Sequence, residues 1–96
     1  MTTNEIEIAT RGQVNARRNY LIGLWAGRML GLRDTQLSDY VCDVMASDFL
    51  EPGPQDVVRK LRRDLSEIGM EISEVEIMRQ LQMTERSVRA ELHTTD

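Results

Sequence analysis

The sequence predicts an all-α protein, a four-helix bundle with a short flexible N-terminal segment. Apolar residues recur at three- and four-residue intervals through four successive stretches of the 96-residue chain, which is the pattern of amphipathic helices. Glycine or proline stands between the stretches, where helices end. Polar and apolar residues alternate only from Glu5 to Ile8, and four residues do not make a strand on their own. Four amphipathic helices with short connections bury their apolar faces most simply against one another.

The first twelve residues are polar and irregular. Gly12 would weaken a helix there by about 1 kcal/mol relative to alanine. We therefore expect residues 1–12 to be a mobile or only partly helical segment. Residues 13–92 are expected to form the four-helix bundle, and residues 93–96 to be a frayed tail.

The first helix of the bundle is expected to begin at Gln13 and to stop at Gly31. Gly23 and Gly27 lie four residues apart and weaken a helix, so we expect them to permit the close approach of another helix. Trp25, the only tryptophan, is interpreted as a core anchor. The expected apolar face consists of Val14, Leu21, Ile22, Leu24, Trp25, Met29 and Leu32.

The second helix is expected to begin at Asp34, which suits the N-cap position, with Thr35 as the alternative cap. It should end before Pro52, because the residue that precedes a proline is disfavoured in the helical conformation. Pro54 suits the first turn of the next helix. The expected buried stripe of the second helix consists of Leu37, Tyr40, Val41, Val44, Met45 and Phe49.

The third helix is expected from about residue 55 to residue 68, closed by Gly69. The fourth begins after Ser73, which forms a capping box with Glu76 three residues later. The residues expected to point inward are Val57, Val58, Leu61, Leu65 and Ile68 on the third helix, and Val75, Ile77, Met78, Leu81, Thr84, Val88 and Leu92 on the fourth.

Charge is segregated along the chain, although the net charge is only −4. Residues 11–33 carry five arginines and no acid, whereas residues 34–51 carry five acids and no base. This pattern favours two antiparallel neighbouring helices and disfavours wrong helix pairings. Its exposed ion pairs would contribute only about 0–1 kcal/mol each.

A second basic cluster follows the proline-rich turn and consists of Arg59, Lys60, Arg62 and Arg63. A basic helix after a turn is typical of helix-turn-helix proteins. However, Asp56 and Asp64 border this cluster and the chain as a whole is acidic, whereas a DNA-binding domain is basic over a whole face. We interpret the cluster as a solvated outer face and expect no nucleic-acid binding.

The residue types that carry catalysis or hold metals are scarce. The single histidine, His93, lies in the expected tail, so neither a catalytic triad nor a histidine-based metal site can be built. Cys42 stands among acidic residues, which disfavour a reactive thiolate. Asp39, Asp43 and Asp48 lie on a helix and lack the loop geometry of calcium sites. We therefore predict no catalytic, cofactor-binding or metal-binding residues and no enzymatic activity.

The chain is expected to be cytoplasmic and not to insert into a membrane. No apolar run approaches the ~20 residues that span a bilayer. The N-terminus lacks the basic and apolar regions of a secretory signal. A single cysteine cannot form an internal disulfide, as is usual in a reducing cytosol.

Two motifs resemble the signatures of a known family. The first is Ala16-Arg17-Arg18-Asn19, then Leu21, Gly23-Leu24-Trp25-Ala26 and Leu30-Gly31-Leu32. The second is Ala46, Asp48-Phe49, Glu51-Pro52-Gly53, Asp56-Val57, Lys60 and Asp64-Leu65, then Gly69, Ser73 and Ile77. In this order, over residues 16–82 and without large gaps, they are similar to the motifs of the zeta subunit family, the ATPase inhibitors of alphaproteobacterial F1Fo-ATP synthases.

The resemblance implies a four-helix bundle that binds the alpha, beta and gamma subunits of F1-ATPase. In the family, a segment ahead of the bundle inserts at a catalytic alpha/beta interface near the central stalk and blocks rotation in the direction of ATP hydrolysis. The candidate partner-binding residues here are Glu5, Ile6, Ile8, Arg11, Arg17 and Arg18. We expect a monomer when free, which becomes peripheral to the inner membrane when bound to F1Fo.

The N-terminal segment departs from the family pattern. Only fifteen residues precede Ala16, and they contain no aromatic residue. Ordering a segment costs about 1–2 kcal/mol per residue, and Ile6, Ile8 and Val14 offer little apolar area in return. We therefore expect a zeta-type regulator whose inhibition is weakened. The alternative is a helical adaptor that uses the bundle surface for a different protein partner.

Overall fold

The computed structural model describes the backbone of residues 3–48 and 53–94, and the side chains of residues 11–48 and 53–92. This part of the chain contains four helices and no strand. The helices are α1 (Thr3–Met29), α2 (Asp34–Ser47), α3 (Gln55–Glu67) and α4 (Glu74–Thr94). The predicted all-α, four-helix fold is therefore confirmed.

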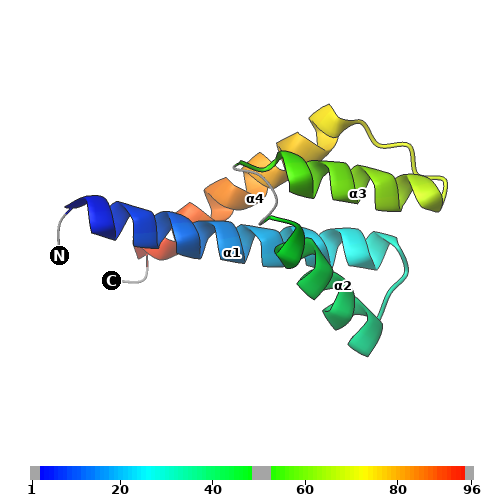
Figure 1. Cartoon of the computed structure of the whole chain (residues 1–96), viewed down its shortest axis with the longest axis horizontal. Coiled ribbons are helices and arrows are strands. Elements are labelled where there is room, and N and C mark those ends of the chain that lie inside the picture. Colours follow the sequence, from blue (N-terminus) through cyan, green and yellow to red (C-terminus); the bar gives the residue numbers. More distant parts are fainter. Residues whose placement is uncertain (1–2, 49–52, 95–96) are drawn as a thin grey trace.

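Helix α1 is the central helix of the molecule (Figure 1). It contacts each of the other three helices, and α2 and α3 lie along its C-terminal half. Helix α4 runs back along α1, so that both termini lie at the same end. At about 1.5 Å per residue, the 27 residues of α1 account for most of the longest dimension in a molecule of 47 × 26 × 21 Å. The N-terminal half of α1 and the C-terminal half of α4 therefore extend beyond α2 and α3.

The helices at the two ends of the chain are longer than the sequence indicated. Helix α1 begins at Thr3 rather than Gln13 and passes through Gly12 without a break. Helix α4 continues to Thr94, beyond the predicted bundle boundary at residue 92. A single glycine weakens a helix by only about 1 kcal/mol, so Gly12 does not have to interrupt it. The mobility expected for residues 1–12 stays a prediction.

Replacing Gly12 with alanine should stabilise the protein. A Cβ atom built at Gly12 meets no other atom within 4 Å, and the position lies inside a helix. The change removes backbone entropy from the unfolded chain, so the free energy of unfolding should rise by about 0.5–1 kcal/mol. Urea denaturation followed by circular dichroism measures this gain. An unchanged or lower free energy of unfolding would contradict this prediction and would show that Gly12 is needed for something other than helix formation.

The expected close approach at Gly23 and Gly27 is confirmed. A Cβ atom at Gly23 would lie 3.3 Å from the backbone Cα of Val41, and one at Gly27 would clash with the side chain of Leu37. Both contacts belong to α2, which therefore crosses α1 directly over the two glycines. This contact places the C-terminal end of α2 beside the middle of α1.

The core lies between the C-terminal half of α1 and the other three helices. On α1 the fully buried row is Val14, Ile22 and Ala26, spaced by multiples of four. Trp25 is only partly buried and packs against the edge of this core. The main core cluster consists of Ile22, Ala26, Val44, Val57, Val58, Leu61, Ile77 and Leu81. Ile22 and Ala26 of α1 therefore pack against residues of all three other helices.

Three residues predicted to face inward, Ile68, Val75 and Leu92, are exposed, so those predictions were wrong; Leu92, near the end of α4, is 39% exposed. Ile68 is 50% exposed because α3 ends at Glu67 and Ile68 is its C-cap residue. Val75 is 79% exposed, since it lies in the first turn of α4 at the edge of a groove. Phe49, which was predicted to be buried, lies outside the described residues.

The structure confirms Gly31, Gly69 and Ser73 as helix-end residues, whereas the N-cap predicted for α2 was wrong. Gly31 and Gly69 end α1 and α3 with positive φ angles of 81° and 84°, which glycine adopts without strain. The Oγ atom of Ser73 accepts a hydrogen bond of 3.1 Å from the backbone N–H of Glu76. The N-cap of α2, however, is Arg33, and Asp34 is the first residue of the helix, with a positive φ of 54°.

Candidate functional site

The first four predicted partner-binding residues lie in the N-terminal half of α1. For Glu5, Ile6 and Ile8 the structure describes only the helical backbone. The side chain of Arg11 is exposed. All four belong to the part of α1 that extends beyond α2 and α3 (Figure 1).

Arg17 remains at the surface, where it has two weak interactions. Its guanidinium lies 5.6 Å from the centre of the Tyr20 ring, a cation–π arrangement. Its Nε atom is 3.9 Å from a carboxylate oxygen of Glu91 on α4. Both members of this ion pair are about half exposed, so the pair contributes little to stability. Arg17 can therefore contact a partner at small cost.

Arg18 is held inside the protein, unlike its neighbour. The residue is only 5% exposed. Its guanidinium lies 3.3 Å from a Glu85 carboxylate oxygen and 3.8 Å from one of Asp48. The Nε–H of Arg18 also donates to Oδ1 of Asn19 at 3.0 Å, and Nδ2 of Asn19 donates to Oδ2 of Asp48 at 2.9 Å. This Arg18 network connects α1 to the C-cap of α2 and to α4.

The Arg18 network explains part of the two sequence motifs. Arg18 and Asn19 belong to the first motif, and Asp48 belongs to the second. Their side chains meet in one partly buried polar cluster that joins α1 to the C-cap of α2. These residues therefore hold helices together, and Arg18 is not exposed to a partner in this structure.

The sequence contained one signal for this network. Arg18 stands four residues after Val14 and four before Ile22, so all three share one face of a helix. Because Val14 and Ile22 are buried, the arginine between them must be buried too. A buried arginine needs anionic partners, and the acids of α2 and α4 were the available candidates.

A second polar cluster joins α2 to α3. The Tyr40 hydroxyl donates a hydrogen bond of 2.8 Å to Oδ2 of Asp64. The Lys60 ammonium lies 3.1 Å from the same oxygen and 5.2 Å from the centre of the Tyr40 ring. Burial and the hydrogen bond to Asp64 raise the pKa of Tyr40 above its ordinary value. The folded state therefore favours the neutral phenol.

The stability of the protein should consequently fall at high pH. The neutral Tyr40 contributes to the free energy of unfolding, and this contribution is fully present below about pH 10, where an unfolded tyrosine ionises. It is lost as pH rises toward the higher pKa of the folded state. Urea unfolding at about pH 8 and about pH 11 should show a larger loss for the natural chain than for Tyr40→Phe. Equal losses would contradict the assigned role of Tyr40.

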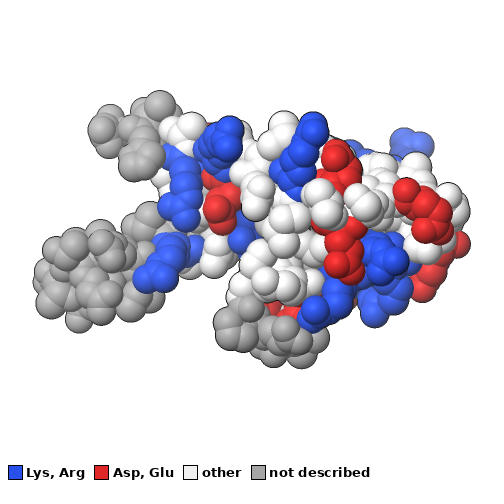
Figure 2. All heavy atoms as spheres, turned by 90° about the horizontal axis from the view of Figure 1, so that it is seen from above, with Lys and Arg blue, Asp and Glu red and all other residues white. Residues whose placement is uncertain are grey.

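Each residue of the basic cluster of α3 has an acidic partner within the protein. Lys60 and Arg63 pair with Asp64, at 3.1 and 3.5 Å. Arg59 pairs with Asp56, and Arg62 lies 3.6 Å from Glu74. Figure 2 accordingly shows positive and negative side chains next to one another on this side of the molecule. This face lacks the single-sign field that nucleic-acid binding requires.

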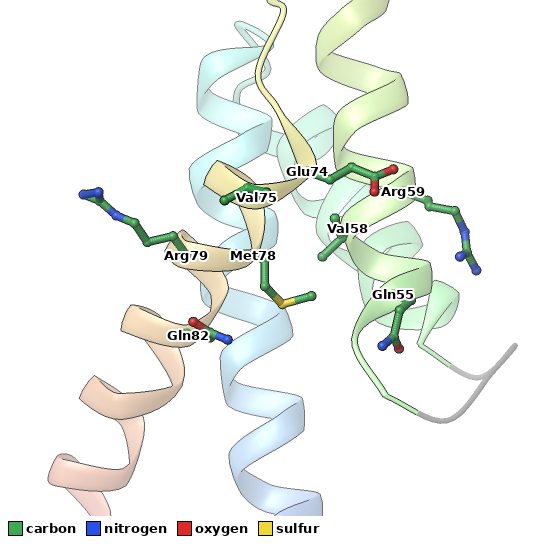
Figure 3. A pocket seen from close by; sticks show the side chains of 8 residues that line it. All are labelled: Gln55, Val58, Arg59, Glu74, Val75, Met78, Arg79 and Gln82. Carbon is green, nitrogen blue, oxygen red and sulfur yellow. The ribbon is translucent and has the colours of Figure 1, made fainter.

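A groove of about 580 Å³ lies between α3 and α4. Val58 and Met78 point toward each other across it, whereas Arg59 and Arg79 point away (Figure 3). Its charged rim residues have internal partners: Arg59 pairs with Asp56, Glu74 with Arg62, and Arg79 with Glu76. The rim of this groove therefore offers no unbalanced charge to select a ligand.

Two adjoining hollows, of about 490 and 360 Å³, lie between α1 and α2. Cys42 and Met45 line both of them, so together they form one groove, which we call the α1/α2 groove. It extends along α1 from Gly12 to Leu24. Sequence reasoning did not find this groove, because it arises from the angle at which α2 crosses α1.

The described residues offer no arrangement typical of a catalytic centre. They contain no group of three or more histidine, cysteine, aspartate or glutamate side chains placed to hold a metal ion. No helix in the described part of the chain has the length and apolar character needed to cross a bilayer. The two polar clusters hold helices together, and the open features are two grooves and a projecting helix.

The described residues define an all-α helical bundle with open grooves between its helices. Residues 6–91 match the family described as ATPase inhibitor subunit zeta, so the chain belongs to the ATPase inhibitor subunit zeta family. A comparison with curated proteins found no match. The resemblance inferred from the two motifs is thereby confirmed, and the family supports a regulatory role on an ATPase.

Proposed function

We propose that this protein binds the F1 sector of ATP synthase and restrains ATP hydrolysis. The observation that carries the proposal is the family match, which covers nearly the whole chain. The projecting N-terminal half of α1 supports it, because a helix that extends beyond its neighbours can enter a partner without opening the bundle. The partners would be the alpha, beta and gamma subunits, and the chain would be a monomer when free.

The contacts to F1 would come from the projecting part of α1. We assign Glu5, Ile6, Ile8 and Arg11 to this contact because of their position, and Arg17 because its surface interactions are weak. Arg18 was expected to contact F1, but we assign it a different role. Its buried ion pairs would fix the direction in which α1 leaves the bundle, which makes it a positioning residue.

We expect the inhibition to be weak, because the N-terminal half of α1 carries few apolar side chains. The backbone of α1 is helical from Thr3, so less conformational entropy remains to be lost on binding than the sequence suggested. The shortage of apolar side chains remains, and Val14 is fully buried against the bundle. The apolar area available for binding is therefore small, which limits affinity.

The proposed cellular location follows from the identity of the partner. A chain that binds the F1 sector would lie in the cytoplasm and would be peripheral to the inner membrane when F1Fo is assembled. This setting requires no membrane-spanning helix in the chain.

The proposal is tested by titrating the purified chain into F1-ATPase from the same organism while ATP hydrolysis is measured. We expect the rate to fall with increasing concentration of the chain and to level off above zero. Co-migration of the chain with F1 in size-exclusion chromatography should accompany this fall. An unchanged rate together with no co-migration would reject the proposal and favour an adaptor for another partner.

A further inference from the structure

The outer side of α4 carries three exposed arginines. Arg79, Arg86 and Arg89 stand seven and three residues apart on this helix, and such spacings place side chains on one face. This face points away from the buried residues Leu81 and Val88. We call Arg79, Arg86 and Arg89 the α4 arginine face. At about 1.5 Å per residue it extends over about 15 Å of the helix.

The acids on this part of α4 already interact with arginines of α1. Residues 79–92 contain only two acids, Glu85 and Glu91. Glu85 lies 3.3 Å from the guanidinium of Arg18, and Glu91 lies 3.9 Å from that of Arg17. Little negative charge is therefore left to balance the α4 arginine face.

The three arginines of this face are balanced only in part. Arg86 forms no ion pair with a described residue. Arg89 lies 3.9 Å from Glu85, which it shares with α1, and Arg79 lies 4.0 Å from Glu76. Exposed pairs at such distances hold their members weakly. The α4 arginine face can therefore exchange these contacts for those of a partner.

The excess of positive charge extends to the neighbouring part of α1. Residues 11–18 add three arginines and no acid, so that with residues 79–92 this region has six arginines and two acids. Asp48 contacts it from α2, which still leaves three arginines in excess in a chain of net charge −4. Glu5 and Glu7 stand further toward the N-terminus. Figure 2 shows positive side chains prevailing over the end of the molecule nearest the termini, whereas both signs mix at the other end.

The chemistry that suits the α4 arginine face is a surface with aspartate and glutamate side chains. A guanidinium group binds a carboxylate through two parallel hydrogen bonds, and a local excess of positive charge attracts an acidic surface. A nucleic acid requires a basic surface over a whole face, whereas Glu85 and Glu91 stand within this region. An acidic protein surface is therefore the favoured partner.

We propose that the α4 arginine face is a second contact surface for F1, which receives aspartate or glutamate side chains of an F1 subunit. This inference rests on the proposed function. The projecting part of α1 and the C-terminal half of α4 lie at the same end of the molecule (Figure 1), so one partner can contact both. The arginines would supply binding energy that the small apolar area of the projecting helix does not.

The first experiment removes the positive charge. The test variant is Arg79→Gln/Arg86→Gln/Arg89→Gln. The matched control neutralises three exposed arginines outside α4, in the variant Arg28→Gln/Arg33→Gln/Arg62→Gln. Both variants change the net charge equally, so a difference between them reports the position of the charge. Affinity for purified F1 is measured at low and high salt, and circular dichroism checks that each variant is folded.

We expect the test variant to lose at least tenfold in affinity for F1 and the control to lose less than twofold. The difference should shrink at high salt. Equal affinities of the two variants would overturn the proposed role of the α4 arginine face while the proposed function survives. Failure of the natural chain to bind F1 would reject both.

The second experiment changes the sign of one added charge. Ala90 is exposed and stands four residues after Arg86, so a group attached there lies beside the α4 arginine face. In the variant Cys42→Ser/Ala90→Cys the single thiol is modified with an anionic or a cationic reagent of equal size. The matched control is Cys42→Ser/Gln36→Cys, modified in the same way at an exposed position of α2.

At position 90 the anionic group should lower the affinity for F1 at least fivefold relative to the cationic group. At position 36 the two groups should differ less than twofold. An effect at position 90 that does not depend on the sign of the charge would contradict recognition of acidic side chains. Binding of the natural chain to vesicles of phosphatidylserine and phosphatidylcholine, lost in the arginine variant while its affinity for F1 is unchanged, would assign the face to a lipid surface and overturn the proposal.

Discussion

Replacing Arg18 with alanine is expected to lower the free energy of unfolding by about 2–3 kcal/mol. The change leaves Asp48 and Glu85 without the cation between them. It also removes the hydrogen bond that Asn19 accepts from Arg18. Because Asp48 and Glu85 keep some contact with water, at 22% and 33% exposure, the loss should lie below the range for fully buried pairs. Urea denaturation measures it.

Arg17 provides the matched control. It is adjacent in sequence and has the same charge, but its pair with Glu91 is exposed. Arg17→Ala should therefore cost less than about 1 kcal/mol. A similar loss in both variants would mean that the burial of Arg18 does not contribute to stability. If Arg18 positions α1, Arg18→Ala should also weaken inhibition of F1 at a temperature where the variant remains folded.

The second large effect is expected in the core. Leu61 is completely buried, and truncation to alanine leaves a cavity as well as removing apolar contacts. Leu61→Ala should lower the free energy of unfolding by about 2–5 kcal/mol. Small domains are stable by only about 5–15 kcal/mol, so thermal unfolding followed by circular dichroism should show a clearly lower Tm.

Val75→Ala is the control for Leu61→Ala. The helical pattern placed both Leu61 and Val75 in the core, but Val75 is 79% exposed. Val75→Ala should therefore change stability by no more than about 0.5 kcal/mol. Comparable losses in the two variants would contradict the position of the first turn of α4.

The sequence predicted the fold class and most helix ends, because these depend on local chemistry. Periodic apolar residues indicated the four helices, and Gly31, Gly69 and Ser73 marked helix ends. Which residues on a helix are buried depends on the neighbouring helices. Ala26 rather than Trp25 therefore faces the centre of the core, and the angle between helices cannot be read from periodicity.

The candidate site was predictable only in part. The family resemblance pointed to the N-terminal segment and was confirmed by the family match. It also placed Arg18 among the partner-binding residues, whereas the structure buries it in an internal network. Long-range pairs such as Arg18–Glu85 depend on the fold as a whole. The α1/α2 groove likewise exists only where two helices cross.

The central claim is that the N-terminal half of α1 restrains ATP hydrolysis by F1. The most direct measurement compares the full chain with one that begins at residue 13, which keeps Val14 and the Arg18 network and should therefore fold. We predict that F1 slows with the full chain and keeps its uninhibited rate with the shorter one. Equal slowing by both chains, or none by either, would contradict the claim.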